Sequence, residues 1–223
     1  MFNTTTVWLS PEEIKQCGEF SEKSAQNQQA IEFGQKTTVP RKTKEIARDN
    51  MIGKMAEVAV AKVLMERYKI HVDLDFNYYP RGQWDEQDLS VNGWSMDVKA
   101  VREFAKWLFV DWNKLVFRQR DGNLSHVYVA CTVGWNRDED EPKGWVRIEG
   151  FASLDKLRIG REKTEVFRKG DLIPGTNTIL QADNFGIRFS DLAHDMDSVV
   201  GYITRNSPPT WLTRNFKNPY TTQ

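Results

Sequence analysis

The sequence lacks the features that define several large protein classes. No apolar run approaches the roughly 18 residues of a membrane-spanning helix, and the first residues are polar where a secretory signal would be basic and then apolar. We therefore expect neither a membrane span nor a secretory signal. The two cysteines, Cys17 and Cys131, lie far apart and show no metal-ligand spacing. This pattern favours a reduced, cytoplasmic protein over a disulfide-stabilised secreted one.

The chain also lacks an excess of charge and the most familiar catalytic motifs. Its 31 basic and 31 acidic residues cancel, so any surface for a polyanion must come from local clusters. The three histidines are scattered and accompany no nucleophile motif, which argues against a catalytic triad. A P-loop, a dinucleotide-binding glycine fingerprint, zinc-ligand spacing and a helix-turn-helix recognition helix are missing too. With 223 residues, the chain is long enough to bury one substantial core.

What the sequence does contain is an acidic hairpin at residues 84–100, WDEQDLSVNGWSMDVKA. Asn92 and the glycine after it tolerate the positive φ angles of a type I′ turn, so two short strands should be joined there. Because side chains alternate along a strand, Asp97 and Lys99 should share one face. The folded hairpin then brings Asp88 towards that face. Two carboxylates and one ammonium group should therefore converge, and this combination suits a hard divalent cation beside a phosphate.

A long helix should precede this hairpin, over residues 43–68. Its centre, IGKMAEVAVAKVL, is apolar almost all round and is therefore predicted to be buried against a sheet. Glu57 is the exception, because a buried carboxylate is costly unless a cation or a hydrogen-bond donor faces it. Pairing with Lys54 or Lys62 on the helix surface is the ordinary explanation. A position beside the acidic hairpin is the functional alternative.

The remaining elements complete an α/β pattern. Ser10 and Pro11 are typical of a helix start, and the helix should reach about residue 33. Asp73 and Asp75 are expected on a solvated strand face and are the main decoys for metal ligands. The closely spaced strands after the hairpin favour a mixed or antiparallel sheet. Strands are expected at residues 70–79, 107–112, 125–135 and 144–152, a late hairpin at 177–182 and 185–189, and helices at 153–157 and 189–204.

Basic residues gather in the loops around these elements. They lie in the link before the long helix, on either side of the acidic hairpin, and in the loop after the last core strand. Contact with a phosphate backbone is one function for them, and an ordinary solvated surface is the alternative. The candidates for nucleic-acid contact are Arg41, Lys42, Lys44, Arg81, Arg102, Lys106, Arg161 and Lys163.

The order of these features resembles the PD-(D/E)xK nuclease superfamily. A buried helix with a lone glutamate is followed by Asp88, a tight hairpin, and then Asp97 and Lys99 separated by one apolar residue. The segment GKMAE also looks like the helix motif of that family. The resemblance covers roughly residues 50–132, and it departs from the family pattern where Gln87 stands in place of proline.

The resemblance implies a restriction-endonuclease-like α/β core, with a central mixed sheet flanked by helices. Asp97 would be the central metal ligand, Asp88 a second or bridging ligand, and the Val98 carbonyl a further one. Glu57 would bind a second ion or a water on that ion. Lys99 would orient or deprotonate the attacking water and offset phosphate charge. The ion would be Mg²⁺, with Mn²⁺ as a substitute.

This interpretation divides the chain into an N-terminal helical extension (residues 1–45), a nuclease core (46–152) and a C-terminal strand-helix region with a tail packed on the core (153–223). The expected activity is metal-dependent hydrolysis of DNA phosphodiester bonds, either of the restriction type or structure-specific. Cutting both strands usually requires two active sites, which makes a homodimer plausible. The competing hypotheses are a catalytically silent nucleic-acid-binding or assembly module on the same fold, and an exposed strand face with a cross-strand ion pair.

Overall fold

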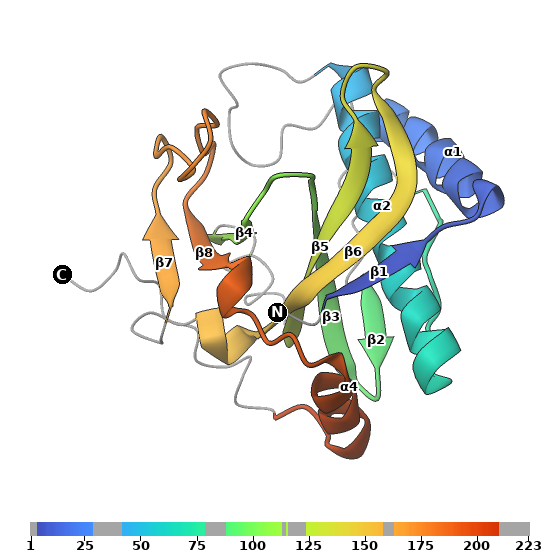
Figure 1. Ribbon diagram of the computed structural model, residues 1–223, viewed down its shortest axis with the longest axis vertical. Coiled ribbons are helices and arrows are strands. Elements are labelled where there is room, and N and C mark those ends of the chain that lie inside the picture. Colours follow the sequence, from blue (N-terminus) through green and yellow to red (C-terminus); the bar gives the residue numbers. More distant parts are fainter. Residues whose placement is uncertain are drawn as a thin grey trace.

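The computed structural model describes residues 4–28, 42–78, 88–112, 115, 124–157 and 163–209, and it shows a mixed α/β architecture (Figure 1). The five-stranded sheet has the order β1-β6-β5-β3-β2, in which β3 and β5 are parallel and the other neighbours antiparallel. A second, antiparallel sheet has the order β4-β8-β7. The strands are β1 (Thr5–Trp8), β2 (Leu89–Val91), β3 (Trp94–Arg102), β4 (Trp107–Asp111), β5 (Val127–Asn136), β6 (Glu141–Ser153), β7 (Thr164–Phe167) and β8 (Asn184–Arg188).

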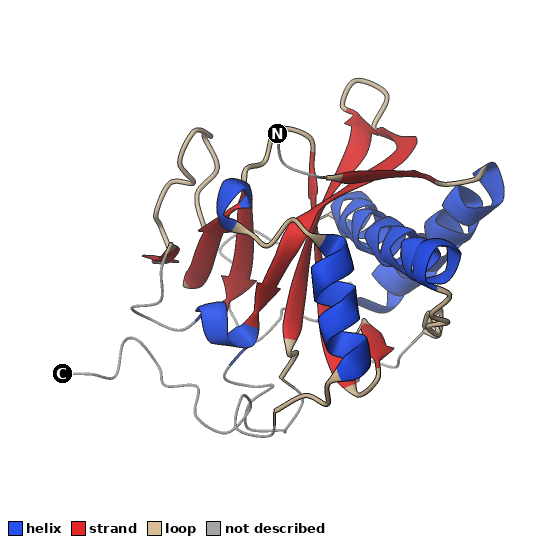
Figure 2. Cartoon of the chain, turned by 60° about the horizontal axis from the view of Figure 1, so that its bottom comes forward, coloured by secondary structure: helices blue, strands red, loops and turns tan. Residues whose placement is uncertain are grey.

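Two long helices lie side by side on the flank of the five-stranded sheet that is away from β7 and β8 (Figure 2). The helices of the described residues are α1 (Pro11–Gln28), α2 (Thr43–Tyr68) and α4 (Met196–Arg205), with the short 3₁₀ turns η1 (Leu154–Leu157) and η2 (Phe189–Asp191). Helix α2 packs against α1 and against β3 and β5 of the sheet. None of these helices is both long enough and apolar enough to cross a membrane.

The N-terminal helix begins where the sequence predicted. The Glu13 N–H donates to Ser10 Oγ at 3.2 Å, and the Ser10 N–H donates to Glu13 Oε2 at 2.6 Å, so each residue caps the other. The predicted end near residue 33 lies outside the described residues. The strand before this helix, β1, was not predicted, and its pairing with β6 places the N-terminal segment in the main sheet.

The long helix has the predicted bounds, Thr43–Tyr68, and its central residues are buried. Lys69 ends it in the left-handed conformation, with φ of 59°. The acidic hairpin is also confirmed: β2 and β3 are joined by Asn92 and Gly93 with φ of 49° and 80°. The Asn92 side chain donates to the Ile203 carbonyl at 3.1 Å, which fixes the turn against α4.

The strands predicted at 107–112, 125–135 and 144–152 are present as β4, β5 and β6. Strand β3 pairs in parallel with β5, so that Asp97 lies beside Tyr128 and Lys99 beside Ala130. Strand β4 does not join this sheet, because it pairs with β8 instead. Strand β3, which carries Asp97 and Lys99, is therefore an inner strand, with the edge strand β2 on one side and β5 on the other.

The prediction of a strand over residues 70–79 is wrong for 70–78, the part that the structure describes. The left-handed Lys69 turns the chain back so that the Ile70 N–H donates to the Leu64 carbonyl at 3.0 Å. The segment then runs along the core without regular pairing, and Leu74 and Phe76 contribute side chains to it. The alternating apolar side chains of residues 70–78 therefore pack on the core although the segment is not a strand.

Two predictions near the C-terminus are also wrong. Residues 177–182 form no strand, because β8 pairs with β4 and β7 and leaves no place for a hairpin partner. The helix predicted over 189–204 begins only at Met196, where the Asp195 side chain accepts the Ser198 N–H. Ala193 instead forms a bridge with Phe151 at the edge of β6, which prevents a helix there.

Candidate active site

Two carboxylates meet at the beginning of the acidic hairpin. Leu89 pairs with Met96, so Asp88, one residue earlier, lies opposite Asp97. The Asp88 and Asp97 side chains share a hydrogen bond, and Asp88 Oδ2 also accepts the Val98 N–H at 2.6 Å. Asp97 is buried, with 4% of its surface exposed. Two carboxyl groups can share a hydrogen bond only when one of them carries a proton, so this contact is unfavourable for two ionised acids.

The surroundings of Asp88 make its ionisation costly. Burial raises the pKa of the Asp88 carboxyl well above its usual range, and the negative charges of Asp97 and Glu57 raise it further. The positive charge of Lys99 acts in the opposite direction. Perturbation of this kind, by burial and by like charges, is typical of functional sites. A cation placed between the two acids would remove the repulsion that keeps the proton bound.

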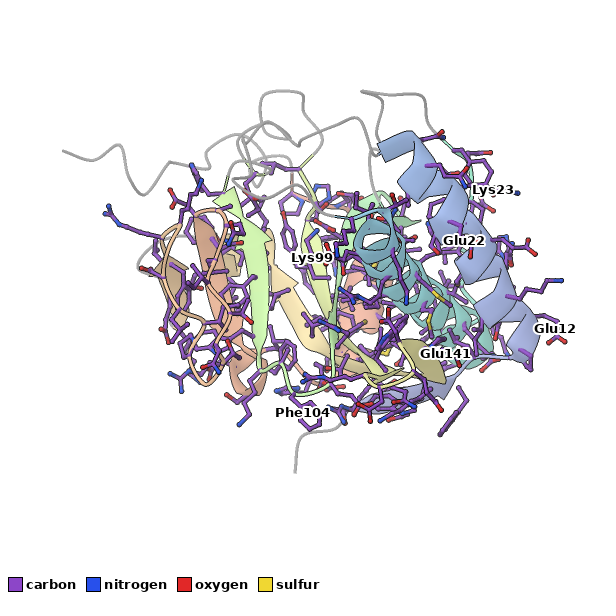
Figure 3. The ribbon with its side chains drawn as sticks, turned by 90° about the horizontal axis from the view of Figure 1, so that it is seen from above. Glu12, Glu22, Lys23, Lys99, Phe104 and Glu141 are labelled. Carbon is purple, nitrogen blue, oxygen red and sulfur yellow. The ribbon has the colours of Figure 1, made fainter. Side chains whose placement is uncertain are left out.

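Lys99 completes the cluster from the same face of β3. Its ammonium group donates to Asp97 Oδ1 at 2.5 Å. This contact is expected because residues two apart in a strand point to the same face. Figure 3 labels Lys99 near the middle of the molecule, between the strands and α2. The side chain keeps 28% of its surface exposed, so its amine lies at the boundary between the buried acids and solvent.

Glu57 comes close to this cluster but has a cation of its own. Its charge raises the pKa of Asp88, which places it within electrostatic range. The ammonium group of Lys54, one turn earlier on α2, donates to Glu57 Oε2. Lys62, the other partner that the sequence allowed, instead binds Glu13 of α1 at 2.9 Å. Helix α1 thus decides which lysine pairs with Glu57.

The acids form a pair rather than a preassembled cage of three. Within the described ranges, no group of three or more His, Cys, Asp and Glu side chains is arranged to hold a metal ion. The donor set at Asp88 and Asp97 nevertheless fits a hard divalent cation, because it consists of carboxylate oxygens in mutual contact. The main chain of Val98 also lies beside this pair, because its N–H donates to Asp88.

The predicted nucleic-acid contacts are spread over several elements. Lys44 is paired with Asp140 at 3.1 Å, and Lys163 with Asp191 at 3.0 Å, so a phosphate would compete with these acids. Arg102 ends the strand that carries Lys99. Lys42 precedes α2, Lys106 precedes β4, and Arg41, Arg81 and Arg161 lie outside the described residues.

Two buried charged residues were not predicted from the sequence. Lys54, expected on the helix surface as a partner of Glu57, has only 4% of its surface exposed. Glu149 in β6 has 6% of its surface exposed. The signal was the same in each case, since a single charge within an apolar run must find a partner when that run is buried.

Comparison with known proteins does not place the chain in a family, since no family model, curated protein or solved structure matches it. What the fold and site define is a mixed α/β protein with a pair of aspartates of which Asp97 is buried, a lysine bound to that aspartate, and a neutralised glutamate nearby.

Proposed function

We propose that this protein is a divalent-metal-dependent DNA endonuclease of the PD-(D/E)xK type, with a restriction-endonuclease-like core. The observation that carries the proposal is the convergence of Asp88, Asp97 and Lys99 at one end of the acidic hairpin. Acids that repel each other in a buried site favour a cation between them, and a lysine at the edge of such a site can meet a phosphate.

Each group has a distinct part in the proposed hydrolysis. When bound, Mg²⁺ or Mn²⁺ would lower the pKa of a water and offset charge on the phosphate. Asp97 and Asp88 would hold it, and the Val98 N–H fixes the orientation of Asp88. Lys99, held by Asp97, would keep its ammonium group against the attacking water or a phosphate oxygen.

The proposed substrate is duplex DNA, cut either at a sequence or at a structure. Because the net formal charge of the chain is zero, we attribute DNA affinity to local cations rather than to the whole surface. The first candidates are Arg102, at the end of the strand that carries Lys99, and Lys106, just before β4. Cutting both strands would use two copies of the site, in a homodimer.

A second function is favoured by one specific observation. Glu57 is bound by Lys54, and no three acidic side chains in the described part of the chain are arranged as a metal cage. A protein that kept the fold but bound nucleic acid without cutting it would tolerate such a pairing. We therefore carry a catalytically silent nucleic-acid-binding or assembly module as the alternative.

A cleavage assay separates these two functions. We expect the wild type to cut linear or supercoiled DNA in Mg²⁺, and Lys99→Ala to lower the rate by about 10²- to 10⁴-fold, the usual loss for a positioned proton-transfer group. Lys143→Ala is the matched control, because Lys143 is an exposed lysine paired with Glu103 at 2.9 Å. If wild type and Lys99→Ala both leave DNA intact yet retard it on a gel, the binding module is correct.

A further inference from the structure

The cluster contains an unusual internal cation. Lys54 lies in the middle of α2 and is buried, and it donates to Glu57 Oε2 and to the Asp75 carbonyl at 2.7 Å. The ring centroids of Phe20 and Phe76 lie 4.6 Å and 5.3 Å from its ammonium nitrogen. A buried ammonium group with a carboxylate, a carbonyl and two aromatic faces as partners is held in one position.

The position of Lys54 matters because the acid that it neutralises, Glu57, lies near the Asp88–Asp97 pair. The charge of Glu57 is felt at Asp88, and Asp88 is in contact with Asp97. Glu57 is thus a third carboxylate within electrostatic range of the aspartate pair, and a second cation would have to be attracted by its charge. Lys54 already supplies a positive charge at that carboxylate.

We propose that the site takes a single divalent cation, between Asp88 and Asp97, and that the Lys54 ammonium group stands in place of a second cation at Glu57. The inference rests on the proposed metal-dependent function and makes it more specific. In this arrangement Lys54 is a positioning residue, because it acts on the site through Glu57 and does not touch the substrate.

The charges of the cluster agree with one cation and not two. Three carboxylates and two ammonium groups, those of Lys54 and Lys99, leave one net negative charge when all the acids are ionised. One divalent cation changes this to one positive charge, which a phosphate can neutralise. A second divalent cation would leave three positive charges in a buried site, a costly state before substrate arrives.

A simple stabilising salt bridge is the ordinary alternative for Lys54 and Glu57, and removal of each charge in turn distinguishes the two. If the pair sets the charge of a metal site, removing one partner should tighten metal binding and removing the other should weaken it. If the pair only stabilises the fold, each removal should weaken binding or leave it unchanged. In both cases, removing the two partners together restores neutrality.

Calorimetric titration with Mn²⁺ alone tests this on four proteins: wild type, Lys54→Met, Glu57→Gln and the double variant. We expect one Mn²⁺ per chain in the wild type, binding about tenfold tighter in Lys54→Met, about tenfold weaker in Glu57→Gln, and near the wild-type affinity in the double variant. Lys62→Met is the control, because Lys62 lies on the same helix and binds Glu13 instead. Thermal melting of each variant checks that it is folded.

The outcomes separate this inference from the proposed function. Failure of the wild type to bind Mn²⁺ would overturn the metal-dependent function itself. Two Mn²⁺ per wild-type chain, or weakening in both single variants, would overturn the role of Lys54 and leave that function standing. If Lys54→Met does not fold, the double variant still decides, since it must bind Mn²⁺ more tightly than Glu57→Gln.

Discussion

Two acidic clusters, each with one buried carboxylate on the five-stranded sheet, are built in opposite ways. In the first, Asp88 and Asp97 share a hydrogen bond at one end of the acidic hairpin. In the second, Glu149 of β6 accepts hydrogen bonds from Arg147 Nε at 2.8 Å and from Thr132 Oγ1 at 2.5 Å. The Arg147 Nη2 atom lies 2.7 Å from the same carboxylate oxygen. The first cluster holds two acids in contact with Lys99 on only one of them, and the second holds one acid against one cation.

The difference shows what each cluster is suited to do. Around Glu149 the charge is balanced by groups of the chain itself, so the contacts hold β5 to β6 and need nothing further. Around Asp88, burial and the charges of Asp97 and Glu57 raise the pKa of the carboxyl, and the opposing charge of Lys99 does not outweigh them. The chain therefore maintains an unfavourable contact there, which is reasonable at a site that a ligand completes.

The largest effect on stability should come from breaking the balanced cluster. Arg147→Met would remove the cation from the buried Glu149 carboxylate, and since the Arg147 side chain is 41% exposed and Thr132 still donates to Glu149, it should lower the free energy of unfolding by about 1.5–3 kcal/mol. Urea unfolding followed by tryptophan fluorescence measures the loss. Arg188→Met is the control, because the Arg188–Glu165 pair, at 3.6 Å, is exposed on both sides and should contribute less than about 1 kcal/mol. Equal losses in the two variants would mean that Glu149 does not depend on Arg147.

The second largest effect should come from a divalent cation, which we expect to stabilise the Asp88–Asp97 cluster and not the Glu149 cluster. Mg²⁺ or Mn²⁺ at about 100 times its dissociation constant should stabilise the wild type by about 2.7 kcal/mol, seen as a rise in melting temperature. Asp97→Ala should abolish that rise, because it removes the central ligand, whereas Arg147→Met should keep it on a lower baseline. An equal rise in Asp97→Ala would move the metal away from the acidic hairpin.

The elements that were predicted correctly are those fixed by local chemistry. The bounds of α2 follow from the apolar content of residues 52–64, and the hairpin follows from two residues that accept positive φ at Asn92 and Gly93. Period-two alternation placed Asp97 and Lys99 on one face, and their 2.5 Å contact follows from it. Each of these features depends on residues that are near in sequence.

The elements that were predicted wrongly depend on distant partners. Residues 70–78 have the pattern of a strand, but no pairing edge is offered to them. Strand β8 pairs with β4, which lies far earlier in the chain, so the hairpin predicted from residues next to β8 in sequence does not form. The pairing of Glu57 was open for the same reason: Glu13 of α1 takes Lys62 and leaves Lys54. Local patterns cannot make such a choice between remote partners.

The smallest effect on stability should come from Asp88→Asn, which tests whether the contact between Asp88 and Asp97 is unfavourable. Because the folded-state pKa of Asp88 is raised, the folded chain holds a proton that the unfolded chain loses, and stability falls as pH rises from about 4 through that raised pKa. The asparagine carbonyl can still accept the Val98 N–H, so only the charge is removed. We expect the free energy of unfolding to rise by about 1 kcal/mol at neutral pH without metal, measured by urea unfolding, and this gain to vanish below about pH 4.

The control is Asp73→Asn, at a side chain 99% exposed, which should change the free energy of unfolding little. A loss of stability in Asp88→Asn at neutral pH would show that Asp88, like Glu149, is stabilised by its neighbours, and the distinction between the two clusters would fail.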